Sequence, residues 1–223
     1  MIYLNRPVRS IAHNRKTRKM NEKFFELKKE KQDRMINAAL LVFSKYGYYH
    51  ASTDEIVKEA NISKGLLFHY FGSKIGMYAF LYDYATRFVT LELTANVEKN
   101  ETDYFALYNE ILSAMAASMA QYPYIFLFLK KADVESQPEA VAEISERREK
   151  YQRIMEALRE RADITNFAQG IDYEKIGEIL DYTTDGLLVK HLKSGNFRAD
   201  LFLEEAKEFT GMIKDMSTVG FKI

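Results

Sequence analysis

The chain has 223 residues, 47% of them hydrophobic, with only three prolines and a formal net charge of zero. This length allows one large domain or a small domain joined to a larger one, and the composition argues against disorder. The absence of cysteine excludes disulfide frameworks, thiolate metal sites and cysteine nucleophiles. The first twenty residues contain arginines and single apolar residues instead of a signal-peptide core, so we expect a cytoplasmic protein.

The charges are unevenly distributed along the chain. Residues 1–80 contain 15 lysines and arginines against 7 acidic residues, whereas residues 81–223 contain 17 against 25. A basic first part followed by an acidic remainder predicts a polyanionic partner for the first part alone. A solvated basic segment without a partner fits the same composition, so charge alone leaves both interpretations open.

Residues 33–47 follow a helical period. Their apolar stripe consists of Ile36, Ala39, Leu40 and Phe43. These positions lie on one face of an amphipathic helix. Gly47 follows the stripe and is expected to be the C-cap.

Three more helices are predicted directly after the first. The second is short and opens with Ser52 and Glu55 at capping-box spacing. Ser63 is placed to cap a third short helix that runs to about Phe71, and Ser73 to cap a long fourth. Two short helices joined by a tight turn, preceded by a longer helix, form the helix-turn-helix arrangement, in which the third helix lies in the DNA major groove.

The third helix has more apolar residues than one buried face requires. Leu67 and Phe71, four residues apart, are expected to face the core. The residues left for the outer and flanking faces are Lys64, Gly65, Leu66, Phe68, His69 and Tyr70. Aromatic rings beside a lysine suit a surface that packs on sugars and thymine methyl groups and donates to phosphates.

The segment FSKYGYYHASTDEIVKEANISKGLLFHYFGSK resembles the DNA-binding signature of TetR-type transcriptional repressors. Its glycines, caps, core positions and aromatic residues fall in register with that signature, and the resemblance covers residues 34–78. It implies an all-α fold with an N-terminal helix-turn-helix DNA-binding domain and a larger helical domain. Such repressors are homodimers whose larger domain binds a small effector.

The resemblance implies roles for individual residues. Thr53 and Lys74 would contact phosphates at the starts of the second and fourth helices, where helix N-termini attract anions. Lys64 would donate to guanine and Leu66 would meet a thymine methyl group. The complete predicted DNA-binding set is Thr53, Ser63, Lys64, Gly65, Leu66, Phe68, His69, Tyr70 and Lys74.

Two positions depart from the family pattern. Phe68 stands where the family often has tyrosine, so a phenolic hydrogen bond to phosphate is missing. Ile75 stands where an acidic residue often follows the lysine. Neither departure removes the motif.

We divide the chain into a basic lead at 1–30, a helix-turn-helix domain at 31–80, and a ligand-binding and dimerisation domain at 81–223. The basic residues before the first helix are Arg15, Lys16, Arg18, Lys19, Lys23, Lys28, Lys29 and Lys31. They can form an arm that reaches phosphates or the minor groove. A disordered lead, or a start of translation at Met20, is the alternative.

Residues 81–223 contain several further helices in sequence. Caps are expected at Asp103, Ser136, Asp172 and Asp200. No glycine-rich phosphate loop, HExxH or G-x-S-x-G motif occurs, and the four histidines lie far apart in sequence. We therefore expect no enzyme activity, no metal site and no cofactor.

One segment of this part needs a test against a membrane span. Residues 111–129 run for 19 residues without a charge, which meets the length criterion for a spanning helix. Pro123 divides the segment, and Ser113, Ser118 and Gln121 interrupt its apolar character. We expect a buried core region and no membrane insertion.

A ligand pocket is predicted from large, soft and hydroxylated side chains on three helices. These residues are Tyr104, Tyr108, Met115, Met119, Phe126, Phe128 and Tyr151. Pockets are commonly apolar with a few polar groups, and methionine adapts to varied shapes. The effector would be apolar or aromatic, because residues 106–129 contain only Glu110 as a charge. An ordinary aromatic core is the alternative.

The last two helices are the predicted dimer surface. The residues expected there are Ile176, Ile179, Thr183, Gly186, Leu187, Phe202, Ala206, Phe209 and Ile213. Two copies would form a four-helix bundle and bind a palindromic operator. A helical ligand- or lipid-binding protein without specific DNA recognition is one alternative, and a membrane-surface protein that uses Phe24 and Phe25 of the lead is another.

Overall fold

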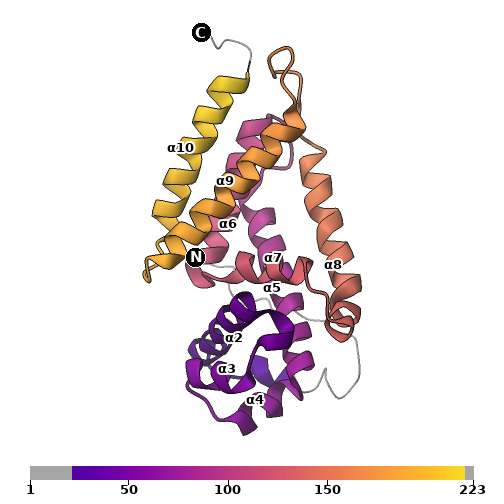
Figure 1. Cartoon of the computed structure of the whole chain (residues 1–223), viewed down its shortest axis with the longest axis vertical. Coiled ribbons are helices and arrows are strands. Elements are labelled where there is room, and N and C mark those ends of the chain that lie inside the picture. The colour runs from indigo at the N-terminus through magenta and orange to yellow at the C-terminus, as the bar shows by residue number, and fades with distance from the viewer. Residues whose placement is uncertain (1–21, 219–223) are drawn as a thin grey trace. The chain divides into compact units, whose positions relative to one another are not determined.

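The computed structural model of the chain describes residues 22–218. A helical turn at residues 22–25 precedes the labelled helices. These are α2 (Lys29–His50), α3 (Thr53–Glu59), α4 (Lys64–Phe71), α5 (Lys74–Asn96), α6 (Tyr104–Gln121), α7 (Ile125–Asp133), α8 (Pro138–Arg159), α9 (Tyr173–Lys193) and α10 (Ala199–Ser217) (Figure 1). Between residues 22 and 218 there is no β-sheet, only two isolated bridges, Asp103 with Asp163 and Phe167 with Thr218. The predicted all-α class is confirmed.

The chain divides into two compact units. Of the described residues, the first unit holds 22–88 and 124–152, and the second holds 89–123 and 153–218. The limits fall inside α5, between α6 and α7, and inside α8. The first unit therefore extends beyond the segment 31–80 that was predicted as the DNA-binding domain, because α7 packs on α2.

The core of the first unit is aromatic. Phe24 is fully buried, and its ring centroid lies 5.2 Å from that of Phe71 and 5.1 Å from that of Phe80. Phe43 of α2 and Phe128 of α7 pack against Tyr78 of α5 with centroid distances of 5.1 and 5.6 Å. These rings fix α2, α5 and α7 against one another, since each contributes a large apolar area to a closely packed interior.

One buried charge cluster joins α5 to α8 within this unit. The carboxylate of Asp83 is 2.8 Å from Nε of Arg87 and 3.3 Å from Nε of Arg147. Burial raises the pKa of Asp83, and the two guanidinium groups oppose that rise. The two guanidinium groups neutralise the Asp83 carboxylate, which would be costly to bury alone.

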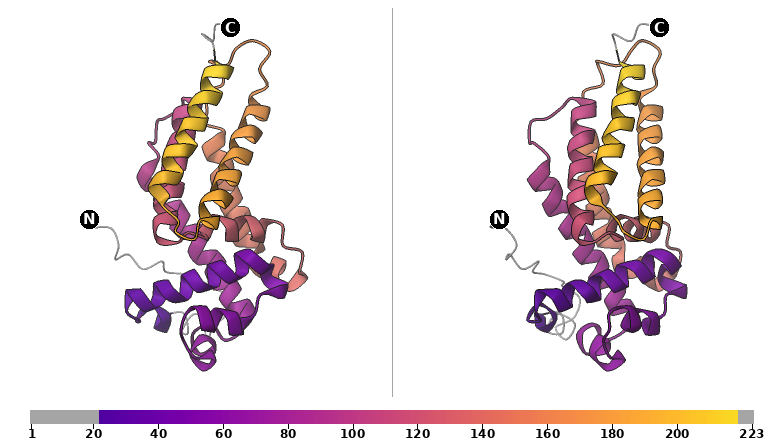
Figure 2. Two further views of the ribbon diagram at one scale, coloured as in Figure 1. Left: turned by 60° about the vertical axis from the view of Figure 1, so that its left-hand side comes forward. Right: turned by 90° about the vertical axis from the view of Figure 1, so that its left-hand side faces the viewer.

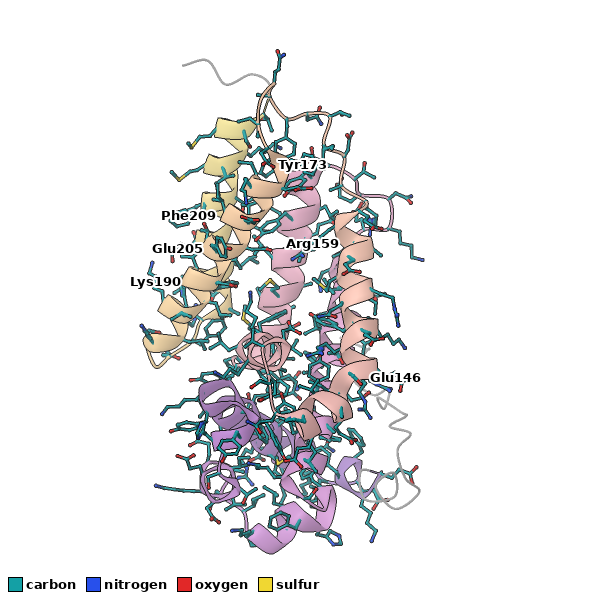
Figure 3. The ribbon with its side chains drawn as sticks, turned by 45° about the vertical axis from the view of Figure 1, so that its right-hand side comes forward. Glu146, Arg159, Tyr173, Lys190, Glu205 and Phe209 are labelled. Carbon is teal, nitrogen blue, oxygen red and sulfur yellow. The ribbon has the colours of Figure 1, made fainter. Side chains whose placement is uncertain are left out.

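In the second unit, α10 packs on α6 and runs antiparallel to α9 (Figure 2). Phe202, Ala206 and Leu188 are buried in this packing. Arg159 near the end of α8 pairs with Asp181 of α9 at 3.1 Å (Figure 3).

The predicted helix starts were right in most cases. Asp103 caps α6 by accepting from the Ala106 N–H at 2.8 Å, and Asp172 caps α9. Asp200 was wrongly predicted as a cap: α10 begins at Ala199, with Arg198 in the cap position two residues before Asp200, and Asp200 instead pairs with that arginine in the first turn.

The uncharged segment at 111–129 is divided as predicted, with α6 ending before Pro123 and α7 starting after it. Within residues 22–218, no single helix is both long and apolar enough to cross a membrane. The bent pair α6 and α7 meets that criterion only when the two helices are counted together.

Candidate nucleic-acid interface

Helix α3 begins with a side-chain cap. Ser52 accepts a hydrogen bond from the N–H of Asp54 at 3.2 Å. Ile56 and Ala60 are fully buried, so α3 packs on the interior through one apolar face. Thr53 is half-buried at the first helical position, beside backbone N–H groups that the helix itself leaves without partners.

Helix α4 follows after a tight turn in which Asn61 adopts φ 51°. Ser63 accepts from the N–H of Leu66 at 3.2 Å, as predicted for a cap. Leu67 and Phe71 are buried, which confirms the expected core face. Because these two residues fix the rotation of the helix, its opposite face is available to a partner.

The outer face of α4 is formed by the residues expected there, with one exception. Lys64, Gly65 and His69 are exposed, and Leu66 and Phe68 are half-buried. A Cβ atom added at Gly65 would meet nothing within 4 Å. The backbone at this position therefore lies open to a close approach by another molecule.

Tyr70 is the exception. It was predicted on the outer or flanking face, but it is only 8% exposed, and its ring lies 5.9 Å from that of Phe24. Positions 67, 70 and 71 share one face of a helix, so Tyr70 lies on the core side. A role for this residue in touching DNA bases is not supported by its position.

Lys64 is held by an acidic residue of the neighbouring helix. Its Nζ lies 2.8 Å from Oδ1 and 3.1 Å from Oδ2 of Asp54. Both side chains are largely exposed, so the pair contributes little to stability. Asp54 was not among the predicted site residues, since nothing in the local pattern indicates that it pairs with a residue ten positions later.

Lys74 is also engaged within the protein. Its Nζ donates to the carbonyl oxygens of Tyr49 at 3.1 Å and Ala51 at 3.3 Å, and lies 4.6 Å from the centre of the Tyr48 ring. These contacts tie the start of α5 to the connection between α2 and α3. The proposed phosphate contact of Lys74 would be made from this anchored position.

Tyr48 is a second residue that sequence analysis missed. Its backbone N–H donates to Glu135 at 2.9 Å, and its hydroxyl donates to Glu139 at 2.6 Å. Burial raises the pKa of Tyr48, and the bond to Glu139 adds to the effect. The partners lie 87 and 91 residues away, beyond the reach of any local pattern.

Glu135 joins the end of α2 to the connection between α7 and α8. It accepts from the backbone N–H groups of Tyr48, Ser136 and Gln137. Ser136 was wrongly predicted as a cap, since α8 begins at Pro138 and Gln137 is the residue directly before it. Burial alone would raise the pKa of Glu135, but these N–H donors and the charge of Lys131 hold it below the ordinary value.

Gly47 allows this arrangement. It interrupts α2 with φ 68° and ψ −179°, a backbone conformation that glycine adopts without strain. A Cβ atom here would also lie 3.2 Å from Cε of Lys131. Beside it is a hollow of about 190 Å³. Its lining residues are Tyr46, Gly47, Tyr49, His50, Lys131, Val134, Glu135, Ser136 and Gln137.

The predicted ligand residues fall into both units. In the second unit, Tyr104, Tyr108 and Met115 of α6 are half-buried and Met119 is fully buried. Tyr108 shares a hydrogen bond of 2.9 Å with Thr184 of α9, and burial raises the pKa of its hydroxyl.

The remaining members of that set belong to the first unit. Phe126 and Tyr151 are buried, and Phe128 lies in the aromatic core. Phe128 has the environment of an ordinary core residue. Within the part of the chain described here, no group of three or more acidic or histidine side chains could hold a metal ion.

The lead at 1–30 is described only from residue 22. Phe24 is fully buried and Phe25 is half-buried, so Phe24 is not exposed for membrane insertion. Lys23, Lys28 and Lys29 are exposed, and Lys29 pairs with Asp33 at 2.6 Å. The four arginines and lysines predicted at 15–19 lie outside the described residues.

Comparison with known proteins identifies the helix-turn-helix region. Residues 35–79 match the model for "Bacterial regulatory proteins, tetR family". Over 49 residues the chain is 41% identical to the HTH-type transcriptional regulator HbdR of Aromatoleum sp. (strain CIB). That match covers 22% of this chain and 21% of HbdR, about a fifth of each protein.

Solved structures resemble the chain over most of its length. A TetR family transcriptional regulator from Chloroflexus aurantiacus J-10-fl has a TM-score of 0.55 at 21% identity, covering 87% of this chain and 94% of that one. The fatty acid degradation regulator FadR from Bacillus halodurans gives 0.51 at 19% identity, covering 80% and 96%. CprB from S. coelicolor A3(2) gives 0.51 at 23%, covering 87% and 92%. At these identities the likeness establishes the fold.

Proposed function

Because residues 35–79 match the model for the tetR family of bacterial regulatory proteins, we propose that the chain belongs to that family and regulates transcription as a homodimeric repressor. It binds a palindromic operator in the cytoplasm and releases it when a small, largely apolar or aromatic effector binds to its helical body. It acts through DNA and effector binding, without catalysis.

The outer face of α4 is the observation that carries this proposal. Lys64, Gly65 and His69 are exposed on a helix whose rotation is fixed by buried Leu67 and Phe71. The starts of α3 and α4 also have backbone N–H groups that the helices leave without partners, and such groups can bind phosphate oxygens. A helix presented in this way can enter the major groove and read base edges.

The exposed apolar face of α9 and α10 supports dimerisation. On α9, Ile179 is 47% and Tyr182 71% exposed, and on α10, Met212 is 60% and Met216 64% exposed. Such a face on two packed helices suits a second copy of the same face in a four-helix bundle. Leu187, Phe202 and Ala206 were expected in this surface but are buried within their own unit.

The effector is proposed from the half-buried aromatic and methionine side chains of α6. Tyr104, Tyr108 and Met115 combine apolar surface with two hydroxyl groups. A ligand with an apolar body and one or two polar groups suits that chemistry. Phe128, by contrast, is more simply explained as core.

Selection of bound duplexes from a random DNA pool by the purified protein, followed by affinity measurements at two salt concentrations, tests the proposal. We expect a palindromic site with half-sites about one helical turn apart. Weak binding to all sequences that disappears with salt would contradict the repressor role. It would favour a helical ligand- or lipid-binding protein instead.

A further inference from the structure

An acidic side chain contacts the surface proposed to meet DNA. Asp54 is in the first turn of α3, and its carboxylate contacts Lys64, the first residue of α4, through both oxygen atoms at 2.8 and 3.1 Å. The pair thus bridges the starts of the two helices. A carboxylate there is unexpected, because DNA phosphates repel it.

Helix stability alone does not explain the pairing. An acidic residue in the first turn stabilises a helix through the dipole, but Glu55 in the same turn provides that effect as well. Only the position of Asp54 brings a carboxylate to Lys64. The feature to be explained is therefore the restraint on the lysine.

We propose that Asp54 is a specificity-determining residue that reserves Lys64 for a guanine edge and keeps it from phosphates. The inference rests on the proposed function, since it needs a protein that distinguishes one DNA sequence from others. The ligand group recognised is the pair of acceptors O6 and N7 of guanine in the major groove.

The hydrogen-bonding capacity of lysine allows both contacts at once. An ammonium group has three N–H donors, so Lys64 can remain on the Asp54 carboxylate and donate a further hydrogen to guanine. To reach a phosphate outside this position, Lys64 has to leave Asp54. The Asp54 carboxylate would then face the DNA without a partner. Lys64 would only have exchanged a carboxylate for a phosphate.

The surroundings of the pair fit a base contact. Gly65 adjoins Lys64, and a Cβ atom there would meet nothing within 4 Å, so the DNA can approach the backbone closely. The ion pair also favours one direction for a long and otherwise mobile side chain. On random DNA the pair presents little net charge, and on the correct site Lys64 contributes a directed hydrogen bond.

The test compares four proteins: the wild type, Asp54→Asn, Lys64→Ala and the double variant. Glu55→Gln is the matched control, because it removes the same charge from the adjacent residue of the same turn. Each full-length protein is titrated with the selected operator and with a random duplex at several salt concentrations. Circular dichroism and thermal unfolding establish that each variant is folded.

We expect Asp54→Asn to free Lys64 for phosphate. Random-duplex affinity should rise about fivefold, and the salt dependence should steepen by roughly one unit, the effect of one added phosphate contact. The ratio of operator to random affinity should fall by about the same factor. Adding Lys64→Ala should return the salt dependence to that of the wild type, and Glu55→Gln should leave it unchanged.

Equal effects of Asp54→Asn and Glu55→Gln would overturn the proposal, since both would then act through net charge alone. A steeper salt dependence that persists in the double variant would also overturn it, because Lys64 would not be the released group. If the wild type selects an operator and Asp54→Asn keeps the same affinity ratio, only this inference fails. If the wild type selects no site, the proposed function fails as well.

Discussion

The outer face of α4 and the outer face of the α9 and α10 pair present opposite chemistry. The first combines capped helix ends, a lysine, a histidine and an open glycine, whereas the second exposes tyrosine, isoleucine and methionine side chains. Polar donors over a fixed backbone suit a charged, grooved partner, and a broad apolar face suits a copy of itself. Each surface suits the partner that we propose for it because of the side chains that it exposes.

The largest expected effect concerns the outer face of α4, which depends on the close packing of Gly76. A Cβ atom at this position would lie 2.2 Å from the carbonyl oxygen of Phe71, which is backbone and has little freedom to move. We expect Gly76→Ala to lower the free energy of unfolding by about 3 kcal/mol. Chemical denaturation, followed by circular dichroism, measures this change in the free energy of unfolding.

Gly65→Ala is the matched control for that variant. Its Cβ atom would meet nothing within 4 Å, and alanine is favoured over glycine in a helix by about 0.5–1 kcal/mol. Stability should rise slightly, while DNA binding weakens because the methyl group obstructs close approach. Equal stability losses in both variants would contradict the packing argument.

A charge placed in the outer face of α9 and α10 should disrupt the proposed dimer. Tyr182 is 71% exposed, so Tyr182→Asp should leave the fold of the protomer intact. In the dimer the aspartate would be buried against apolar surface, which should weaken association by at least about 2 kcal/mol. Analytical ultracentrifugation over a range of concentrations measures the change.

Leu91→Asp provides the comparison, because Leu91 is an exposed apolar residue on a different helix, α5. We expect this variant to dimerise as the wild type does. If both substitutions dissociate the protein equally, the interface is not confined to α9 and α10.

The reading of bases is tested by Lys64→Ala. Loss of a directed donor to guanine should cost about 1–3 kcal/mol on the operator and relax the preference at one base position. Repeating the duplex selection with the variant measures that preference.

Lys74→Ala should instead weaken binding to all sequences alike and lower the salt slope by roughly one unit. If the two variants behave identically, Lys64 and Lys74 do not have separate base-reading and phosphate-binding roles.

The connection behind the DNA-facing surface should respond to a smaller change. Tyr48→Phe keeps the ring under Lys74 and the backbone bond to Glu135 but removes the hydroxyl that donates to Glu139. We expect a stability loss of about 1 kcal/mol by thermal unfolding. Tyr49→Phe, at an exposed neighbour, should have no effect, and an equal loss there would exclude a special role for Tyr48.

The smallest expected effect is a dependence of stability on pH. The pKa of Glu135 is lowered in the folded protein from its ordinary value of 4.5. Its ionised form therefore stabilises the fold above that value, and the contribution is lost as the pH falls through the lowered pKa. The difference in unfolding free energy between wild type and Glu135→Gln should shrink from pH 7 to pH 3; a constant difference would contradict this assignment.

Local features could be predicted from the sequence, whereas long-range contacts could not. Ser52, Ser63 and Asp103 were identified as caps because a cap bonds within three residues of itself. The burial of Leu67 and Phe71 followed from helical spacing. The start of α10 was predicted two residues too late, because Asp200 is a favourable cap residue, whereas Arg198 occupies the cap position without a side-chain hydrogen bond.

Tyr70 and Tyr48 illustrate why the rest was missed. The burial of Tyr70 depends on Phe24, which lies far upstream in a segment that was interpreted as a basic lead. Tyr48 depends on Glu135 and Glu139 in another part of the fold. Such contacts are set by tertiary packing, and one sequence contains no periodic signal for them.

The composition of the first unit has a practical consequence for building chimeric regulators. Residues 124–152 contribute Phe128 to its core and Glu135 and Glu139 to its hydrogen bonds. A transplant cut at residue 80 would leave these groups behind and expose the aromatic side of α2. An exchangeable DNA-binding module of this protein therefore consists of two stretches of chain, and a graft onto another body has to include both.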